Sequence, residues 1–173
     1  MNRRAFLAAL LAAPIASRAE AHTAPSPSER SALAPRISAR YRVSRHAVER
    51  VAQLAAEAFP RDPRLLLAIV GVESSWRPWA IGDHGEIGLC QVRPDMHGPG
   101  SAALLDPEVN LRTAGALLER HVARFGMLAG VARYNGAGPE AEKYAARVLA
   151  ERRRLARDER IADEVFRTKA GGQ

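Results

Sequence analysis

Apolar residues recur at the spacing of an α-helix in several stretches of the chain, and capping residues stand at their starts. Ser44 can cap the first of these helices through its hydroxyl. Asp62 with Pro63, and Asp106 with Pro107, each combine an N-cap with a first-turn proline, so each pair opens a further helix. The pattern predicts five helices, at about residues 44–59, 62–74, 106–126, 127–135 and from 139 onwards.

The segments between these helices predict the domain organisation. Residues 76–101 contain five glycines and three prolines, a density that excludes a long helix and predicts a loop-rich stretch. Few β-branched runs occur, so we expect a mainly α fold with at most a small β element in that stretch. Residues 22–42 hold prolines among Ser, Thr, Ala and Arg, and are expected to form a flexible linker. The domain is then expected over 43–150, followed by a charged helical extension over 151–173.

Composition narrows the classes of protein that remain. A length of 173 residues favours one domain with a real hydrophobic core. The single cysteine excludes an intrachain disulfide and a cysteine-based structural zinc site. The net charge of +7 favours an anionic partner, such as nucleic acid, an acidic membrane face or an acidic wall polymer.

Residues 1–21 have the pattern of a cleaved export signal. Arg3 and Arg4 precede a 12-residue apolar run, which is too short for a stable membrane anchor, and 19–21 fit a small-x-small cleavage site. The start also resembles a twin-arginine signal. The alternatives are an ordinary secretory signal and a buried N-terminal helix. Export predicts a periplasmic or extracytoplasmic protein and excludes nucleic acid as the partner.

Glu73 lies at the end of the second predicted helix, which is apolar nearly all round and should therefore be buried. It follows Ile69 by four residues and Leu66 by seven, so it shares their face. Burial and the negative end of the helix dipole both raise the pKa of a carboxyl group above the ordinary ~4.3. Glu73 is therefore a candidate proton donor. A Glu that turns to solvent or pairs with an arginine remains the alternative.

Four short motifs follow one another along the chain and extend this interpretation. They are Glu73-Ser74, Gly88-Leu89-Cys90-Gln91, Asp106-Pro107 with Asn110, and Tyr134-Asn135-Gly136-Ala137-Gly138. In this order and spacing, over about residues 62–149, the chain resembles the soluble lytic transglycosylases of the lysozyme-like superfamily, which are related to goose-type lysozyme. The resemblance implies a lysozyme-like α-helical domain with the Gly-rich loop beside the catalytic helix.

The resemblance also implies a reaction that needs neither a metal nor another cofactor. Glu73 would protonate the oxygen that joins N-acetylmuramic acid (MurNAc) to N-acetylglucosamine (GlcNAc) in peptidoglycan. It would then accept the proton of the muramic C6 hydroxyl, which closes on C1 and leaves a 1,6-anhydro end. The substrate's acetamido group would steady the positive charge at C1.

Five further residues match substrate-binding positions of the family. These are Ser74, Gln91, Tyr134, Asn135 and Tyr144. The family implies that Ser74 bonds the sugar or orients the acid, and that Gln91 offers its amide to an acetamido group. Tyr134 and Asn135 would form the facing wall, where a sugar or Glu73 would satisfy the tyrosine hydroxyl. For Ser74 the alternative is an ordinary hydroxyl at a helix end, and for Tyr134 it is plain packing.

The chain departs from the family pattern at two positions. Cys90 stands in a slot that is usually Met, and we interpret it as a packing change. Arg133 stands where the family often has a small apolar residue, and either points to solvent or reaches carboxylates of the substrate's peptide. Trp76 and Trp79 follow the acid, and each either lines a sugar cleft or packs in the core.

Several alternatives stay open. A hydrolytic, goose-type lysozyme-like muramidase would need a second carboxylate, for which the loop offers Asp83, Glu86 and Asp95. Cys90 is a possible nucleophile with His84 or His97 as its base, and His84, His97 and Asp83 are a possible metal site. A non-catalytic wall-binding module of the same fold is a further hypothesis.

The expected partners follow from the enzyme hypothesis. We expect a monomer that acts on peptidoglycan glycan strands, and a specialised role with a secretion system or other envelope assembly is a further hypothesis. Residues 147–169 carry eight Lys or Arg and five acids. We interpret them as a solvated helix partly packed on the domain, with a wall-binding or partner-binding extension as the alternative.

Overall fold

The computed structural model describes residues 27–98 and 100–170, so the predicted export signal at 1–21 lies outside the described residues. The described chain is helical, and the prediction of a mainly α fold is confirmed. Its helices, with one 3-10 turn (η1), are α1 (Pro27–Tyr41), α2 (Arg45–Ala58), α3 (Pro63–Glu73), α4 (Pro94–His97), η1 (Ala103–Leu105), α5 (Pro107–Phe125), α6 (Met127–Asn135) and α7 (Pro139–Ala170). None of the helices in 27–98 and 100–170 is long and apolar enough to cross a membrane.

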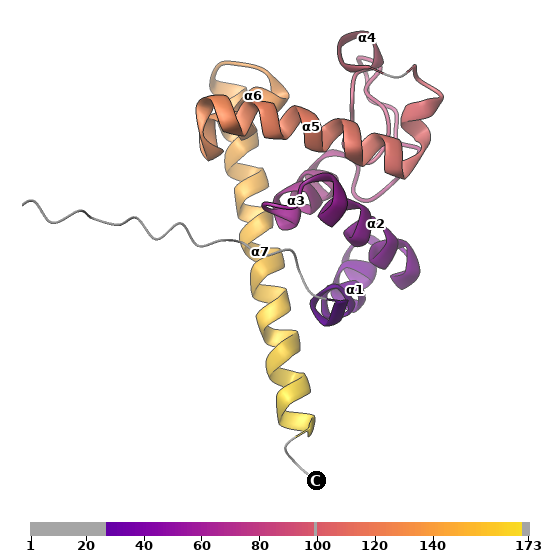
Figure 1. Ribbon diagram of the computed structural model, residues 1–173, viewed down its shortest axis with the longest axis vertical. Helices are drawn as coiled ribbons and strands as arrows, with labels where there is room; N and C mark the ends of the chain where they lie inside the picture. The colour runs from indigo at the N-terminus through magenta and orange to yellow at the C-terminus, as the bar shows by residue number, and fades with distance from the viewer. Residues whose placement is uncertain (1–26, 99, 171–173) are drawn as a thin grey trace, which may run out of the picture.

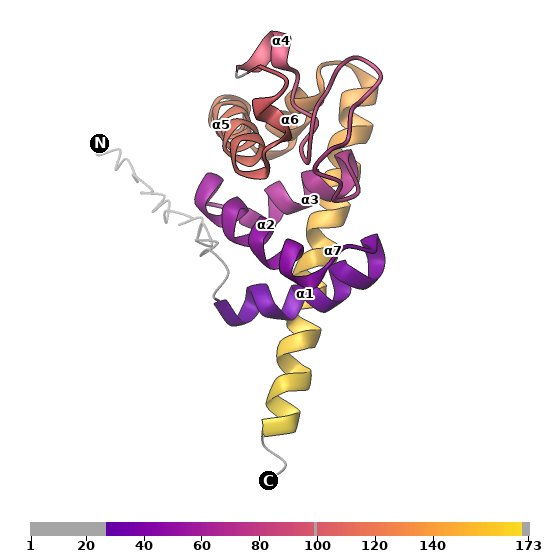
Figure 2. The same cartoon turned by 90° about the vertical axis from the view of Figure 1, so that its right-hand side faces the viewer.

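Helix α7 runs along the length of the molecule, and α1, α3 and α6 all contact it (Figures 1 and 2). Helix α3 is the central element and is buried from Leu65 to Gly71. The carboxylate of Asp62 caps α3 by accepting from the Leu65 N–H at 3.2 Å, and it also pairs with Arg152 of α7 at 2.6 Å. The cap therefore ties the start of α3 to α7, and the opposite end of α3 is Glu73.

The prediction of a flexible linker over 22–42 is wrong for its described part, Pro27–Tyr41, which forms helix α1. Leu33 and Ile37 lie one helical turn apart and are fully buried. They pack in the core beside α2 and α7. The proline-rich composition hid this apolar face, because Pro35 lies within the helix on an exposed position.

The predicted boundary between the domain and its extension, at 150/151, falls inside the single helix α7. The side chains of Glu151 and Asp158 are buried and pair with Arg40 of α1 at 3.4 and 2.8 Å. Up to Arg160 the charged stretch is therefore packed against the domain, because its acids face arginines of the N-terminal helices.

The Gly-rich stretch after α3 forms a compact loop. The chain reverses through left-handed conformations at Ser75 (φ 51°) and Trp76 (φ 67°). Among the described residues β-pairing is limited to two isolated antiparallel bridges, between Ile81 and Ile87 and between Ile87 and Val92. This small element lies beside the C-terminal end of the helix that carries Glu73.

Candidate active site

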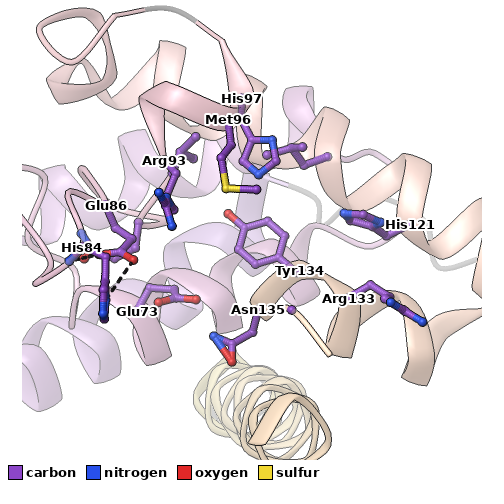
Figure 3. A pocket seen from close by; sticks show the side chains of 14 residues that line it. Glu73, His84, Glu86, Arg93, Met96, His97, His121, Arg133, Tyr134 and Asn135 are labelled. Atoms are coloured by element: carbon purple, nitrogen blue, oxygen red, sulfur yellow. Dashed lines mark hydrogen bonds and ion pairs between the residues drawn. The ribbon is translucent and has the colours of Figure 1, made fainter. Parts of the chain in front are cut away.

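A pocket of about 700 Å³ opens where α3 ends, a volume typical of ligand sites. The loop after α3 forms one wall, and α5 and α6 form the facing wall (Figure 3). Its lining residues are Glu73, His84, Glu86, Gln91, Val92, Arg93, Met96, His97, Leu117, His121, Arg133, Tyr134, Asn135 and Gly136.

Glu73 is half-buried and lines this pocket at the end of α3. Burial raises the pKa of its carboxyl group above the ordinary value. The Tyr144 hydroxyl and the Arg147 guanidinium oppose this rise in pKa, whereas the nearby Glu86 carboxylate adds to it. The direction agrees with the sequence-based expectation, and it favours a neutral acid that can donate a proton into the pocket.

Asn110 holds the loop that carries the Gly-Leu-Cys-Gln motif. Its fully buried side chain accepts from the Cys90 N–H at 2.8 Å and donates to the carbonyls of Ile87 and Leu104 at 2.8 and 3.0 Å. Gly88 has φ +80°, and a Cβ there would lie 2.6 Å from the Leu104 carbonyl oxygen and collide with the Asn110 amide. Only glycine fits this close approach.

Gln91 reaches the pocket from a left-handed backbone conformation (φ 48°). Its Nε2 donates to the carbonyls of Ala80 and Gly88 at 3.1 and 3.0 Å, so both amide hydrogens are occupied. No described residue donates to its Oε1. The side chain is thus oriented by the loop and retains one acceptor for a ligand.

Tyr134 and Asn135, at the end of α6, lie on the facing wall (Figure 3). The Tyr134 hydroxyl donates to the Cys90 carbonyl at 2.9 Å, so its partner is the loop backbone and not Glu73. Its ring stacks on that of Tyr144, with centroids 6.5 Å apart. Asn135 is exposed at the pocket rim, where its amide is open to a ligand.

Two of the six residues predicted from the sequence do not line the pocket. Ser74 is fully buried, and its hydroxyl donates to the Val70 carbonyl of its own helix at 3.2 Å, which is the alternative that the sequence left open. Tyr144 lies in the core beneath Glu73. Burial, together with the neighbouring Glu73 carboxylate that its hydroxyl approaches, raises the pKa of Tyr144 well above the ordinary value.

The pocket also contains residues that sequence reasoning did not select. Arg93 lines it while pairing with Asp95 at 2.6 Å. Glu86, which the sequence offered as a candidate second carboxylate, also lines it while accepting from the His84 N–H at 3.0 Å. His121 follows Asn110 by eleven residues, three helical turns, and this spacing was the signal that could have placed it beside the loop.

Other predictions for aromatic and reactive side chains can be compared with the structure. Trp76 packs in the core, whereas Trp79 is 72% exposed. Cys90 is fully buried, and burial raises the pKa of its thiol well above the ordinary value, which disfavours the nucleophilic thiolate. Within the described part of the chain no three His, Cys, Asp or Glu side chains are grouped so that they could hold a metal ion.

Comparisons with known proteins agree with this arrangement. Residues 50–155 match the model of the transglycosylase SLT domain family. The chain is also 29% identical over 93 residues to proteins named endo-type membrane-bound lytic murein transglycosylase A from Citrobacter koseri and from two strains of Klebsiella pneumoniae. Each match covers 47% of this chain and 45% of the relative, so the chain aligns with less than half of each. Because the family match spans more than half of the 173 residues, the chain belongs to the transglycosylase SLT domain family.

Proposed function

We propose that this protein is a peptidoglycan lytic transglycosylase that cleaves the MurNAc-β-1,4-GlcNAc bond with Glu73 as its acid and base. The observation that carries the proposal is a half-buried carboxyl group with a raised pKa that faces a 700 Å³ pocket. The family match and the names of the relatives support the substrate class.

In the proposed reaction the neutral Glu73 donates its proton to the glycosidic oxygen, and the C1–O bond breaks. The resulting carboxylate then accepts the proton of the muramic C6 hydroxyl, whose oxygen bonds to C1 and closes the 1,6-anhydro ring. The acid is regenerated and no water is consumed. Gln91 Oε1 can accept from an acetamido N–H, and Asn135 can bond a sugar from the opposite wall.

A hydrolytic outcome is the second candidate, and one observation favours it. Glu86 lines the same pocket, and its charge raises the pKa of Glu73. A second carboxylate in this position could activate a water molecule in place of the C6 hydroxyl. The pocket geometry is compatible with both outcomes, and only the product distinguishes them.

Export to the periplasm is part of the proposal, because peptidoglycan lies outside the cytoplasmic membrane. The basic start and short apolar run of residues 1–21 support it. The relatives are named membrane-bound.

The test is product analysis by mass spectrometry on purified sacculi, with the wild-type protein and Glu73→Gln compared side by side. We expect fragments with 1,6-anhydromuramic ends from the wild type and none from the variant. Fragments with reducing muramic ends would instead show that the reaction is hydrolysis. A variant that supports the protein's biological role as well as the wild type would instead indicate a non-catalytic wall-binding module.

Thermal unfolding is the control that checks whether Glu73→Gln keeps its fold. A carboxyl group with a raised folded pKa stays protonated in the folded state after the unfolded chain has ionised. Wild-type stability therefore falls as the pH rises from the unfolded pKa through the folded one. The glutamine variant lacks this loss, so it should be at least as stable as the wild type near neutral pH.

A further inference from the structure

A second groove, of about 660 Å³, lies between α6 and α7 beside the pocket. Its floor consists of small side chains from both helices and from the turn that joins them. These are Ala129, Ala132, Ala137, Ala141, Ala145 and Ala146. Phe125 and Leu128 add larger apolar surface, and both are exposed. The lining of the groove is therefore mainly apolar.

The groove adjoins the pocket that contains Glu73. Arg133 and Gly136 line both cavities, so these two residues form the boundary between them. A ligand that occupies the pocket and reaches this boundary lies next to the groove.

The boundary between the two cavities carries an available positive charge. The Arg133 guanidinium lies 5.4 Å from the centroid of the Phe125 ring, which orients it by a cation–π contact. No carboxylate among the described residues pairs with Arg133. Arg124 lies over the same ring at 5.1 Å, and Glu142 is the one acid that lines the described groove. The entrance thus favours an anionic ligand.

We propose that this groove binds the peptide that peptidoglycan carries on the lactyl group of muramic acid, with Arg133 paired to a carboxylate of that peptide. This inference rests on the proposed function. The peptide is attached to the sugar whose bond is cleaved, so it must leave the pocket near the reacting centre. It consists of small residues such as alanine and of acidic residues, which match the alanine floor and the arginine at its entrance.

The test compares soluble, uncross-linked glycan strands that carry their peptides with the same strands after an amidase has removed the peptides. The readout is the ratio of kcat/KM for the two substrates, from the rate at which new chain ends form. We expect the wild type to prefer the peptide-bearing strands. Arg133→Ala should reduce this preference about fivefold, as for loss of one accessible ion pair. Ala146→Trp, which fills the groove, should reduce the preference to near one.

Each variant has a matched control. Arg124 also lies over the Phe125 ring but lines neither cavity, so Arg124→Ala is the control for Arg133→Ala. Ala150 lies one turn beyond Ala146 on α7 and outside the groove, so Ala150→Trp is the control for Ala146→Trp. Both should keep the wild-type preference.

The outcomes separate the two proposals. Cleavage of neither substrate by the wild type would overturn the proposed function and this inference with it. Cleavage of both substrates at equal rates, or a preference unchanged by Arg133→Ala and Ala146→Trp, would overturn the peptide groove and leave the proposed function standing.

Discussion

Asn110 and Tyr134, on two different helices, both form hydrogen bonds with the backbone of Cys90. The Asn110 side-chain oxygen Oδ1 accepts from the Cys90 N–H at 2.8 Å, and the Tyr134 hydroxyl donates to the Cys90 carbonyl at 2.9 Å. Helices α5 and α6 thus hold the loop on both sides, one residue before Gln91. The position of Gln91 relative to Glu73 depends on these bonds.

Asn110→Ala should destabilise the protein by about 3 kcal/mol, because the Cys90 N–H and the Leu104 carbonyl lose their partner and the Ile87 carbonyl keeps only the Val92 N–H. Thermal or denaturant unfolding measures this change. The loop that carries Gln91 should loosen, so activity should fall even where the variant remains folded. Thr113→Ala is the control on the same helix, since it removes one bond to the Val109 carbonyl and should cost about 1 kcal/mol or less. Equal stability of the two variants would contradict the role of the Asn110 side chain in holding the loop.

Two substitutions should move the alkaline limb of the pH–activity profile in opposite directions. Activity requires the protonated acid, so it falls as the pH rises through the pKa of Glu73. Glu86→Gln removes a like charge that raises this pKa, and the limb should shift to lower pH. Arg147→Gln removes a positive charge that lowers it, and the limb should shift to higher pH.

The measurement is kcat/KM across pH, and the position of the limb matters more than the maximum rate. A shift in the same direction for both variants would show that Glu73 is not the group whose ionisation limits activity.

Tyr144→Phe should move the alkaline limb of the pH–activity profile to higher pH, because the Tyr144 hydroxyl interacts with the Glu73 carboxylate and opposes the rise of its pKa. Tyr134→Phe is the matched comparison, because its hydroxyl bonds to the Cys90 carbonyl. It should cost about 1 kcal/mol of stability and leave the limb at its wild-type position. A limb that does not move in Tyr144→Phe would contradict an interaction between this hydroxyl and Glu73.

Arg40→Ala should destabilise the protein by about 2 kcal/mol, because the side chains of Glu151 and Asp158 are buried and both lose a charged partner. Arg61→Ala breaks a pair with Glu119 in which both side chains are half exposed, and should cost less than about 0.5 kcal/mol. Chemical denaturation compares the two variants. Similar losses would show that the pairs of Arg40 contribute no more than a surface ion pair.

Much of the helical framework and part of the site could be predicted from local patterns. The Asp-Pro pairs at 62–63 and 106–107 open α3 and α5 as predicted, because capping and proline geometry act within one turn. The raised pKa of Glu73 followed from its place on an apolar helix face. Ser74 could not be placed in this way, since its neighbour faces the pocket while its own hydroxyl turns back to Val70.

The sequence by itself determined where the helices start, which helix is central, and which carboxyl group is a candidate acid, because spacing and burial pattern are encoded locally. Only the tertiary structure decided that 27–41 is a packed helix, that Tyr134 bonds the Cys90 carbonyl, and that Arg133 lines two cavities. These features depend on contacts between segments far apart in the chain. Such contacts are set by how helix faces pack on one another, which residue spacing does not specify.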